Sequence, residues 1–435
     1  MAKTMCSGKL LSFSKDKSYL VGSIVSFLIL CGLWSVLDHS WSGASASAME
    51  KPRYSVLGKD EQSINRSKNP DPPEKTFYDD PKLSYTFGSP PKDWDEKRRV
   101  WMKLHPSIAA GDGGKVVVVT GSQPQPCESP VGDHLLLRLF KNKVDYCRIH
   151  GCEVFYNNAF LHPKMPSVWA KLPPVRAAMV AHPEAEWVWW LDSDTVVTDM
   201  ELQLPLEKYR NHNLVINGWE DMVYEKKSWF GLNTGIFLIR NCQWSMDLIE
   251  VWSSFGPLNP DHEKLAKTIV PEVKDKLFSN LDEQSALVYL LSKEKEKWGD
   301  KVYIENGYSF SGYWLEIVDR LESISRRYAE SERADAGLRR RRSEKVSGLY
   351  AALRERYLKG THDGKGGWRR PFITHFTGCQ PCSGHFSPSY TAESCRSGME
   401  RALNFADNQV LRNYGFFRPD LLNSSFVSPL QFDSP

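Results

Sequence analysis

The chain has 435 residues, of which 41% are hydrophobic and 25% charged, and its formal net charge at pH 7 is +3. This length allows one large domain or two ordinary ones, and the apolar content is typical of a globular protein. A net charge this small gives no support for binding to nucleic acid, which needs a basic surface.

An uncharged, largely apolar stretch at residues 18–37 is the first predicted element. It is long enough for one helix to cross a bilayer, and Lys residues precede it while Asp38 follows it. The positive-inside rule therefore predicts a cytosolic tail at 1–17, a single-pass transmembrane signal anchor at 18–37 and a lumenal remainder. A cleaved signal peptide is the alternative, which the length of the apolar stretch disfavours.

Residues 38–95 are predicted to form a lumenal stem in front of a globular domain at residues 96–435. The stem is rich in Ser, Lys, Asp and Pro and shows little apolar periodicity, so it cannot bury enough surface to fold alone. Asn65 and Asn423 each stand in an N-x-S sequence and are predicted N-glycosylation sites.

Seven of the nine Cys residues follow the predicted membrane span, on the side where disulfides form. Because seven is odd, at least one Cys is expected to stay free or to pair between chains. Cys379 and Cys382 have the spacing of a zinc or redox pair, but no second C-x-x-C exists to complete a zinc site. Structural disulfides or plain thiols are favoured, and the sequence does not reveal which cysteines pair.

Strands and helices alternate in the first half of the predicted globular domain. Four consecutive Val residues at 116–119 are typical of a buried central strand, and apolar residues at a helical period follow them. This alternation predicts an α/β fold with a mostly parallel sheet. The elements are expected at residues 115–120 (strand), 133–147 (helix), 152–156 (strand), 169–181 (helix interrupted by two prolines) and 187–191 (strand).

The aromatic-rich strand at 187–191 ends in Asp192, Ser193 and Asp194. Ionised carboxylates are costly to bury without a cation or hydrogen bonds, and ligands gather at the carboxyl ends of strands in open α/β sheets. Asp192 and Asp194 are therefore candidate oxygen ligands of a divalent cation. An acidic turn whose side chains bind nearby backbone amides is an equally supported alternative.

Three other segments carry candidate binding residues. The first strand ends in Thr120-Gly121-Ser122, whose backbone amides could meet a nucleotide, although a simple turn explains this sequence as well. Glycines flank Asn233 before a strand at 236–239, which either lets the backbone approach a ligand closely or only turns the chain. Asp282, Glu283 and Gln284 begin a helical run, where they either face a sugar or stabilise the helix N-terminus through its dipole.

Two stretches stand out in the C-terminal half. Residues 319–358 are rich in Arg and have a thin apolar helical pattern, which favours a solvated helical insertion over a contact with a partner or polyanion. Residues 372–374 are predicted to form a short strand, which His375 and Gly378 follow. A lone His is more often structural, but at a strand end His375 is also a candidate third metal ligand beside a loop that contacts phosphate.

The order of these motifs resembles plant family 34 of the glycosyltransferases, which contains galactosyl- and xylosyltransferases. The resemblance implies a GT-A-type nucleotide-sugar transferase domain. Within that family the chain is most similar to galactomannan galactosyltransferases, and Gln380 stands where the xyloglucan xylosyltransferases carry Lys. The resemblance covers residues 75–430 and rests on W-A-K-L-P at 169–173, W-W-L-D-S-D at 189–194, G-L-N-T-G at 231–235, L-D-E-Q-S-A at 281–286 and H-F-T-G-C-Q-P-C at 375–382.

The resemblance also implies a ligand set. Mn²⁺ would be held by Asp192, Asp194 and His375 and would bind the diphosphate of a UDP-sugar. The reaction would proceed with retention and give an α-linkage. Near the sugars the resemblance places the catalytic candidates Asp282, Glu283 and Gln284, without showing whether any of them is a nucleophile. The residues implied for donor binding are Thr120, Gly121, Ser122, Asp192, Ser193, Asp194, Asn233, Gly378 and Gln380.

The expected function is that of a Golgi type II membrane enzyme. It would transfer an α-galactosyl group from UDP-galactose to the 6-position of mannosyl residues in a β-1,4-mannan, with a mannan synthase or a second copy of the chain as candidate partners. Xylosyl transfer from UDP-xylose to xyloglucan is the alternative within the enzyme class. A non-catalytic polysaccharide-binding or assembly subunit is the alternative outside it.

Overall fold

A computed structural model of the chain describes residues 75–109, 115–339, 342–361 and 367–430. The predicted tail, the predicted membrane span at 18–37, most of the predicted stem and Asn65 lie outside these ranges. Within them, no helix is both long enough and apolar enough to cross a bilayer.

The compact unit already includes the first described residues, from residue 75 on, well before the domain boundary expected at residue 96. Phe77 and Trp94 are buried, and their rings meet edge to face with centroids 4.8 Å apart. The indole N–H of Trp94 donates to Asn241 at 2.7 Å. Residues 75–95 are therefore part of the globular unit and not of a stem, because their aromatic side chains supply apolar surface to its core.

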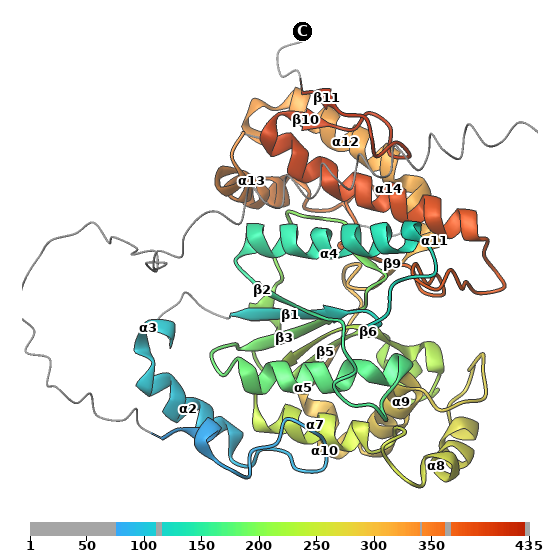
Figure 1. Cartoon of the computed structure of the whole chain (residues 1–435). Helices are drawn as coiled ribbons and strands as arrows, with labels where there is room; N and C mark the ends of the chain where they lie inside the picture. Colours follow the sequence, from blue (N-terminus) through green and yellow to red (C-terminus); the bar gives the residue numbers. More distant parts are fainter. Residues whose placement is uncertain (1–74, 110–114, 340–341, 362–366, 431–435) are drawn as a thin grey trace, which may run out of the picture. The chain divides into compact units, whose positions relative to one another are not determined.

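A mixed sheet of six strands forms the centre of the unit (Figure 1). Three of its five pairings are parallel, and β6 runs antiparallel to both of its neighbours. The predicted α/β fold is thus confirmed, and its sheet is mixed, with parallel pairings in the majority. In sheet order the strands are β2 (Glu153–Asn157), β1 (Val116–Gly121), β3 (Trp187–Leu191), β6 (Leu232–Arg240), β5 (Leu214–Gly218) and β7 (Val302–Glu305).

The sheet is covered by helices on both faces, which is why its central strands are apolar throughout (Figure 1). Successive side chains of a strand point to opposite faces, so Val117 and Val119 pack into one core and Val118 into the other. Helix α4 (Pro130–His150) covers one face. Helices α5 (Leu172–Ala181), α7 (Gln243–Ser253) and α9 (Glu283–Lys293) cover the other.

The two prolines expected to interrupt a helix instead stand at its start. A short 3-10 turn, η2 (Ser167–Lys171), leads into α5, and Pro173 and Pro174 occupy the first turn of that helix. Backbone N–H groups in a first helical turn have no partner within the helix, so proline costs little there. The buried Lys171 lies at the junction of the two segments.

A second, three-stranded sheet continues from the end of β3. Its strands are β4 (Thr195–Val197), β9 (Ile373–His375) and β8 (Gly312–Tyr313), and β4 pairs antiparallel with β9. Thr195 lies opposite His375 in that pairing. His375 is therefore the last residue of β9, whereas the sequence predicted that the strand ends at residue 374 and that His375 follows it.

The Arg-rich segment at 319–358 is helical, as predicted, but it is not wholly solvated. Helix α12 (Leu321–Ala334) packs Leu321 and Tyr328 into the core. In helix α13 (Glu344–Tyr357), Arg354 is only 4% exposed and its guanidinium lies 2.8 Å from Glu201. This ion pair joins α13 to the body of the domain.

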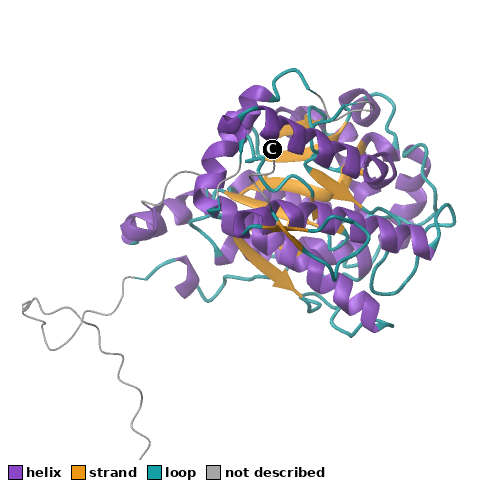
Figure 2. Ribbon diagram, turned by 90° about the horizontal axis from the view of Figure 1, so that it is seen from above, coloured by secondary structure: helices purple, strands orange, loops and turns teal. Residues whose placement is uncertain are grey.

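Helix α14 (Ala392–Leu411) packs over α4 as an outer layer that the sequence did not predict (Figure 1). Figure 2 shows helices around the strands of the sheet. The remaining helices and strands are α2 (Trp94–Leu104), α3 (Pro106–Ala109), α6 (Glu220–Tyr224), α8 (His262–Ile269), α10 (Lys295–Trp298), α11 (Trp314–Ile317), β10 (Phe416–Phe417) and β11 (Ser428–Pro429).

Three disulfides form within the described residues, namely Cys127–Cys382, Cys147–Cys152 and Cys379–Cys395, and Cys242 is free. The prediction that at least one cysteine has no intrachain partner is confirmed. Cys379 and Cys382 belong to two different disulfides, so they form neither a zinc site nor a redox pair. These two bonds hold both ends of the C-x-x-C loop.

Candidate functional site

Asp192, Asp194 and His375 converge at the carboxyl end of β3 and form what we call the Asp–Asp–His cluster. The two aspartates lie in the turn between β3 and β4, and the β4–β9 pairing brings His375 beside them. The backbone N–H of Phe376 donates to the carbonyl of Asp194 at 3.0 Å, which fixes the approach of the two segments. One ligand atom from each of the three side chains lies within 4.8 Å of the others.

Gly235 lets the side chains of His375 and Asp192 lie close to the backbone of β6, because glycine has no Cβ. A Cβ at position 235 would lie 2.2 Å from Cε1 of His375 and 2.8 Å from Oδ2 of Asp192. On the other side of the imidazole, the hydroxyl of Ser311 lies 3.2 Å from Nδ1 of His375. This contact leaves Nε2, which lies 3.4 Å from Asp194, to face the cluster.

Two buried side chains hold Asp192. The indole N–H of Trp190 donates to Oδ1 of Asp192 at 2.6 Å, and the ammonium of Lys171 lies 3.3 Å from the same oxygen. Lys171 also lies 2.7 Å from Glu283. Burial opposes the charge of Lys171, but the negative charges of Asp192 and Glu283 raise its pKa above the ordinary value, so the ammonium is charged at neutral pH.

The donor set of the Asp–Asp–His cluster fits a divalent cation. A second lysine, Lys143, lies behind the cluster and donates to the carbonyl of Thr195 at 2.8 Å. Burial lowers the pKa of Lys143 to about 7, although Asp194 and Asp192 oppose this shift. Carboxylate oxygens and one imidazole together suit a cation such as Mn²⁺.

A cleft of about 580 Å³ opens over the two aspartates. Of the residues expected to bind a donor, those that line it are Gly121, Ser122, Asp192, Ser193, Asp194 and Gln380. Within the described part of the chain, the other three are not in its wall. Thr120 is buried in β1, Asn233 accepts hydrogen bonds from Gly235 N–H and Ser311, and Gly378 turns the chain with a φ of 80°.

The disulfide Cys127–Cys382 joins two segments of the wall of this cleft. Gln380, Cys382 and Ser383 line the cleft, and so do Pro126 and Glu128, which flank Cys127. The backbone N–H of Glu128 also donates to the carbonyl of Cys382 at 3.3 Å. Segments far apart in the sequence are thereby held as one surface.

The three expected catalytic residues are buried at the start of α9, and within the described residues none of them lines the cleft. Asp282 is the N-cap of α9, accepts from Ser285 N–H and lies 2.8 Å from the ammonium of Lys276. Gln284 binds backbone groups on both sides, at Trp229 and Thr234. Only Glu283 connects to the cluster, through Lys171, so a catalytic role for the trio stays a prediction.

Sequence reasoning gave no role to Lys171, Trp190 or Ser311, although the first two stand in quoted motifs. A signal was present at Lys171, because it is the one charged residue in the W-A-K-L-P segment at 169–173. A Lys in such surroundings is seldom buried without a partner. No comparable signal marked Ser311, whose contact with His375 depends on the pairing of β8 and β9.

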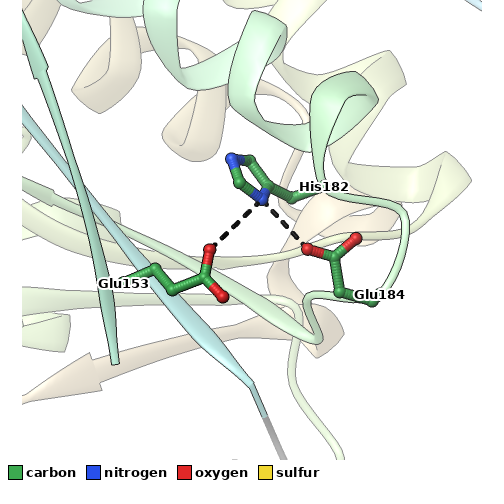
Figure 3. A group of neighbouring side chains, drawn as sticks. All are labelled: Glu153, His182 and Glu184. Atoms are coloured by element: carbon green, nitrogen blue, oxygen red, sulfur yellow. Dashed lines mark hydrogen bonds and ion pairs between the residues drawn. The ribbon is translucent and has the colours of Figure 1, made fainter. Parts of the chain in front are cut away.

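A second group of side chains that could hold a metal ion lies at the amino end of β2 (Figure 3). Nδ1 of His182 lies 3.0 Å from Glu184 and 3.8 Å from Glu153, the first residue of β2. The hydrogen bond to Glu184, with its negative charge, raises the pKa of His182 despite partial burial. An ion pair accounts for this arrangement, because one imidazolium N–H can face both carboxylates.

Comparison with known sequences identifies the family. Residues 112–386 match the galactosyl transferase GMA12/MNN10 family, which is more than half of the chain. The chain belongs to this family. It is therefore a glycosyltransferase of family 34, as the order of its motifs indicated, and the Asp–Asp–His cluster and the cleft lie within the matched residues or next to them.

Similar relatives come from several plants. Galactomannan galactosyltransferase 1 of Cyamopsis tetragonoloba is 53% identical over 428 residues, covering 96% of this chain and 95% of that protein. Glycosyltransferase 6 of Arabidopsis thaliana is 52% identical, covering 96% and 94%. Probable xyloglucan 6-xylosyltransferase 1 of Oryza sativa subsp. indica is 45% identical, covering 80% and 70%.

Proposed function

We propose that this family 34 glycosyltransferase transfers an α-galactosyl group from UDP-galactose to the 6-position of mannosyl residues in a β-1,4-mannan, with retention. The observation that supports this most directly is the Asp–Asp–His cluster at the base of a 580 Å³ cleft. The choice of sugar and acceptor follows the similarity to the galactomannan enzyme, which is 53% identical along nearly the whole chain.

In this proposal Asp192, Asp194 and His375 hold Mn²⁺, which would stabilise the charge that develops on the departing diphosphate. The chain itself binds and orients the donor. Gly121 and Ser122 end β1 in the wall of the cleft, where they would lie beside the nucleotide. Gln380 offers an amide from the disulfide-held wall and brings no positive charge. Trp190 and Lys171 keep the carboxylate of Asp192 directed.

The proposal places the enzyme in the Golgi membrane as a single-pass type II protein with a lumenal catalytic domain. Three disulfides support a lumenal site, because such bonds persist in oxidising compartments. Asn423 is exposed, as an N-glycan acceptor must be. A mannan synthase, or a second copy of this chain, is the proposed partner for building the branched polysaccharide.

The donor and acceptor are tested together in a matrix of UDP-galactose and UDP-xylose against manno- and cello-oligosaccharides. With Mn²⁺ present, we expect galactose to be transferred to manno-oligosaccharides and the product to carry an α-linkage by NMR. Xylosyl transfer to cello-oligosaccharides is the second candidate, which the 45% identity to a xyloglucan 6-xylosyltransferase favours. Equal or better turnover with UDP-xylose contradicts the galactosyl assignment.

A non-catalytic polysaccharide-binding subunit would behave differently in the same matrix. It would neither hydrolyse nor transfer any of the donors, yet it would still bind an oligosaccharide. The presence of all three side chains of the Asp–Asp–His cluster favours the enzyme over this alternative. Hydrolysis of the donor without transfer would support an enzymatic function and would contradict only the proposed acceptor.

A further inference from the structure

The ammonium of Lys171 has all three of its N–H donors directed at groups of the protein. It donates to Oε1 of Glu283 at 2.7 Å, to the carbonyl of Thr234 at 3.2 Å and to Oδ2 of Asp192 at 3.5 Å. A lysine offers three donors and no acceptor. Lys171 therefore has no N–H left for a donor sugar or phosphate, although it forms part of the cleft wall.

Glu283 stands behind Lys171, away from the cleft. Its side chain is 4% exposed and it accepts a further hydrogen bond of 2.9 Å from the hydroxyl of Thr234. Burial raises the pKa of Glu283, and the positive charge of the ammonium 2.7 Å away opposes this shift. One cation thus lies between two carboxylates, of which only Asp192 belongs to the Asp–Asp–His cluster.

We propose that Lys171 and Glu283 form a positioning pair that sets the divalent-cation affinity of the Asp–Asp–His cluster through the charge and direction of Asp192. This inference rests on the proposed metal site and goes beyond it. The positive charge of Lys171 lowers the cation affinity of the cluster, and the negative charge of Glu283 limits that effect. The same contacts, with the hydrogen bond from Trp190, hold the carboxylate of Asp192 in one orientation.

Neutralising Lys171 and neutralising Glu283 are expected to change the Mn²⁺ affinity in opposite directions. Lys171→Met removes a positive charge beside Asp192, so Mn²⁺ is expected to bind about tenfold more tightly while transfer slows because Asp192 loses its orientation. Glu283→Gln removes a negative charge and keeps the hydrogen-bond acceptor, so Mn²⁺ is expected to bind about tenfold more weakly. The double variant Lys171→Met/Glu283→Gln restores the local charge and is expected to bind Mn²⁺ almost as the wild type does.

The measurement is binding of Mn²⁺ alone to the purified full-length protein, followed by the EPR signal of free Mn²⁺. Transfer rate is measured in parallel, because a purely structural defect would slow transfer and weaken Mn²⁺ binding together. The double variant guards against misfolding of the single variants, since a neutral pair leaves no buried charge without a partner. Circular dichroism checks that each variant is folded.

A matched control is available in the same region of the chain. Arg176 in α5 is fully buried and its guanidinium lies 2.9 Å from Glu250, as Lys171 pairs with Glu283. Arg176 is not in the cleft wall. Arg176→Met is expected to lower stability and to leave the Mn²⁺ affinity unchanged.

The outcomes separate this inference from the metal site on which it rests. Absence of Mn²⁺ binding to the wild type overturns both. Binding to the wild type, with both single variants shifted in the same direction or not at all, overturns the positioning pair and keeps the metal site. Opposite shifts that cancel in the double variant are the result the inference requires.

Discussion

At the scale of single residues, the Asp–Asp–His cluster carries the clearest prediction. Asp194→Ala removes a proposed direct ligand and is expected to lower the transfer rate by about two to three orders of magnitude. His375→Ala is expected to raise the Mn²⁺ concentration needed for half-maximal transfer. Both variants should stay folded, because the cluster lies at the edge of the sheet. Transfer rate against Mn²⁺ concentration tests both, and a folded His375→Ala with the wild-type response would remove His375 from the ligand set.

Gly235 is a second residue whose substitution acts on the cluster without changing a ligand. In Gly235→Ala the new Cβ meets His375 at 2.2 Å, so the imidazole must move. We expect Mn²⁺ binding and transfer to fall by about 10- to 100-fold, as for other groups that orient metal ligands. Gly348→Ala in α13 is the matched control, because a Cβ there meets nothing within 4 Å. Normal Mn²⁺ binding by Gly235→Ala would show that the site tolerates a displaced imidazole.

At the scale of elements, the ion pairs of His182 join the end of α5 to the first residue of β2. The folded pKa of His182 is raised, so its contribution to stability is complete below the unfolded pKa of about 6.5 and is lost as pH rises through the folded pKa. The pKa of Glu184 is lowered despite burial, through its hydrogen bond with His182. Its contribution is therefore lost as pH falls through that lower pKa.

This linkage predicts that His182→Gln destabilises the protein more at mildly acidic pH than at pH 8. The expected difference in the free energy of unfolding is on the order of 1 kcal/mol or less, because the group is partly exposed to solvent. Urea unfolding of both proteins at the two pH values measures it. If the loss is equal at both values, the imidazole is not charged at the lower pH and the ion pairs are absent.

The elements that could be predicted from the sequence are those whose pattern is local. The apolar run at β3 fixed its bounds at Trp187–Leu191, and the turn after it supplied the two aspartates. The partner of that turn could not be predicted, because β4 pairs with a strand that follows much later in the chain. Helix α14 has a capping box at Thr391 and a buried face that packs against α4. Its many polar residues made the apolar periodicity of this face too weak to predict the helix.

The site shows the same division between local and distant information. The motifs indicated Asp192, Asp194 and His375, whose ligand atoms the structure brings within 4.8 Å of one another. They did not reveal that Glu283 faces Lys171 instead of the cleft. That orientation depends on how α9 packs against β6 and α7, and no pattern within the L-D-E-Q-S-A segment encodes it.

At the scale of the whole molecule, the proposed topology can be tested in sealed microsomes. We expect added protease to spare everything after residue 38 until detergent opens the vesicles, because the positive-inside rule places that part in the lumen. Asn423→Gln should remove one glycan-sized shift on a gel if Asn423 is modified. Digestion of the domain in intact vesicles would reverse the assigned orientation.

The Cys127–Cys382 bond has a consequence for how the protein is made. The two cysteines are 255 residues apart, and every strand from β2 to β9 lies between them. Because a chain is synthesised from its N-terminus, the Cys127–Cys382 bond cannot form until nearly all of the domain has been made. The strands of the central sheet are complete in a nascent chain that still lacks Cys382, but the two segments of the cleft wall are joined only afterwards, and only where thiols are oxidised. Covalent closure of the cleft wall is therefore a late event in the making of the protein.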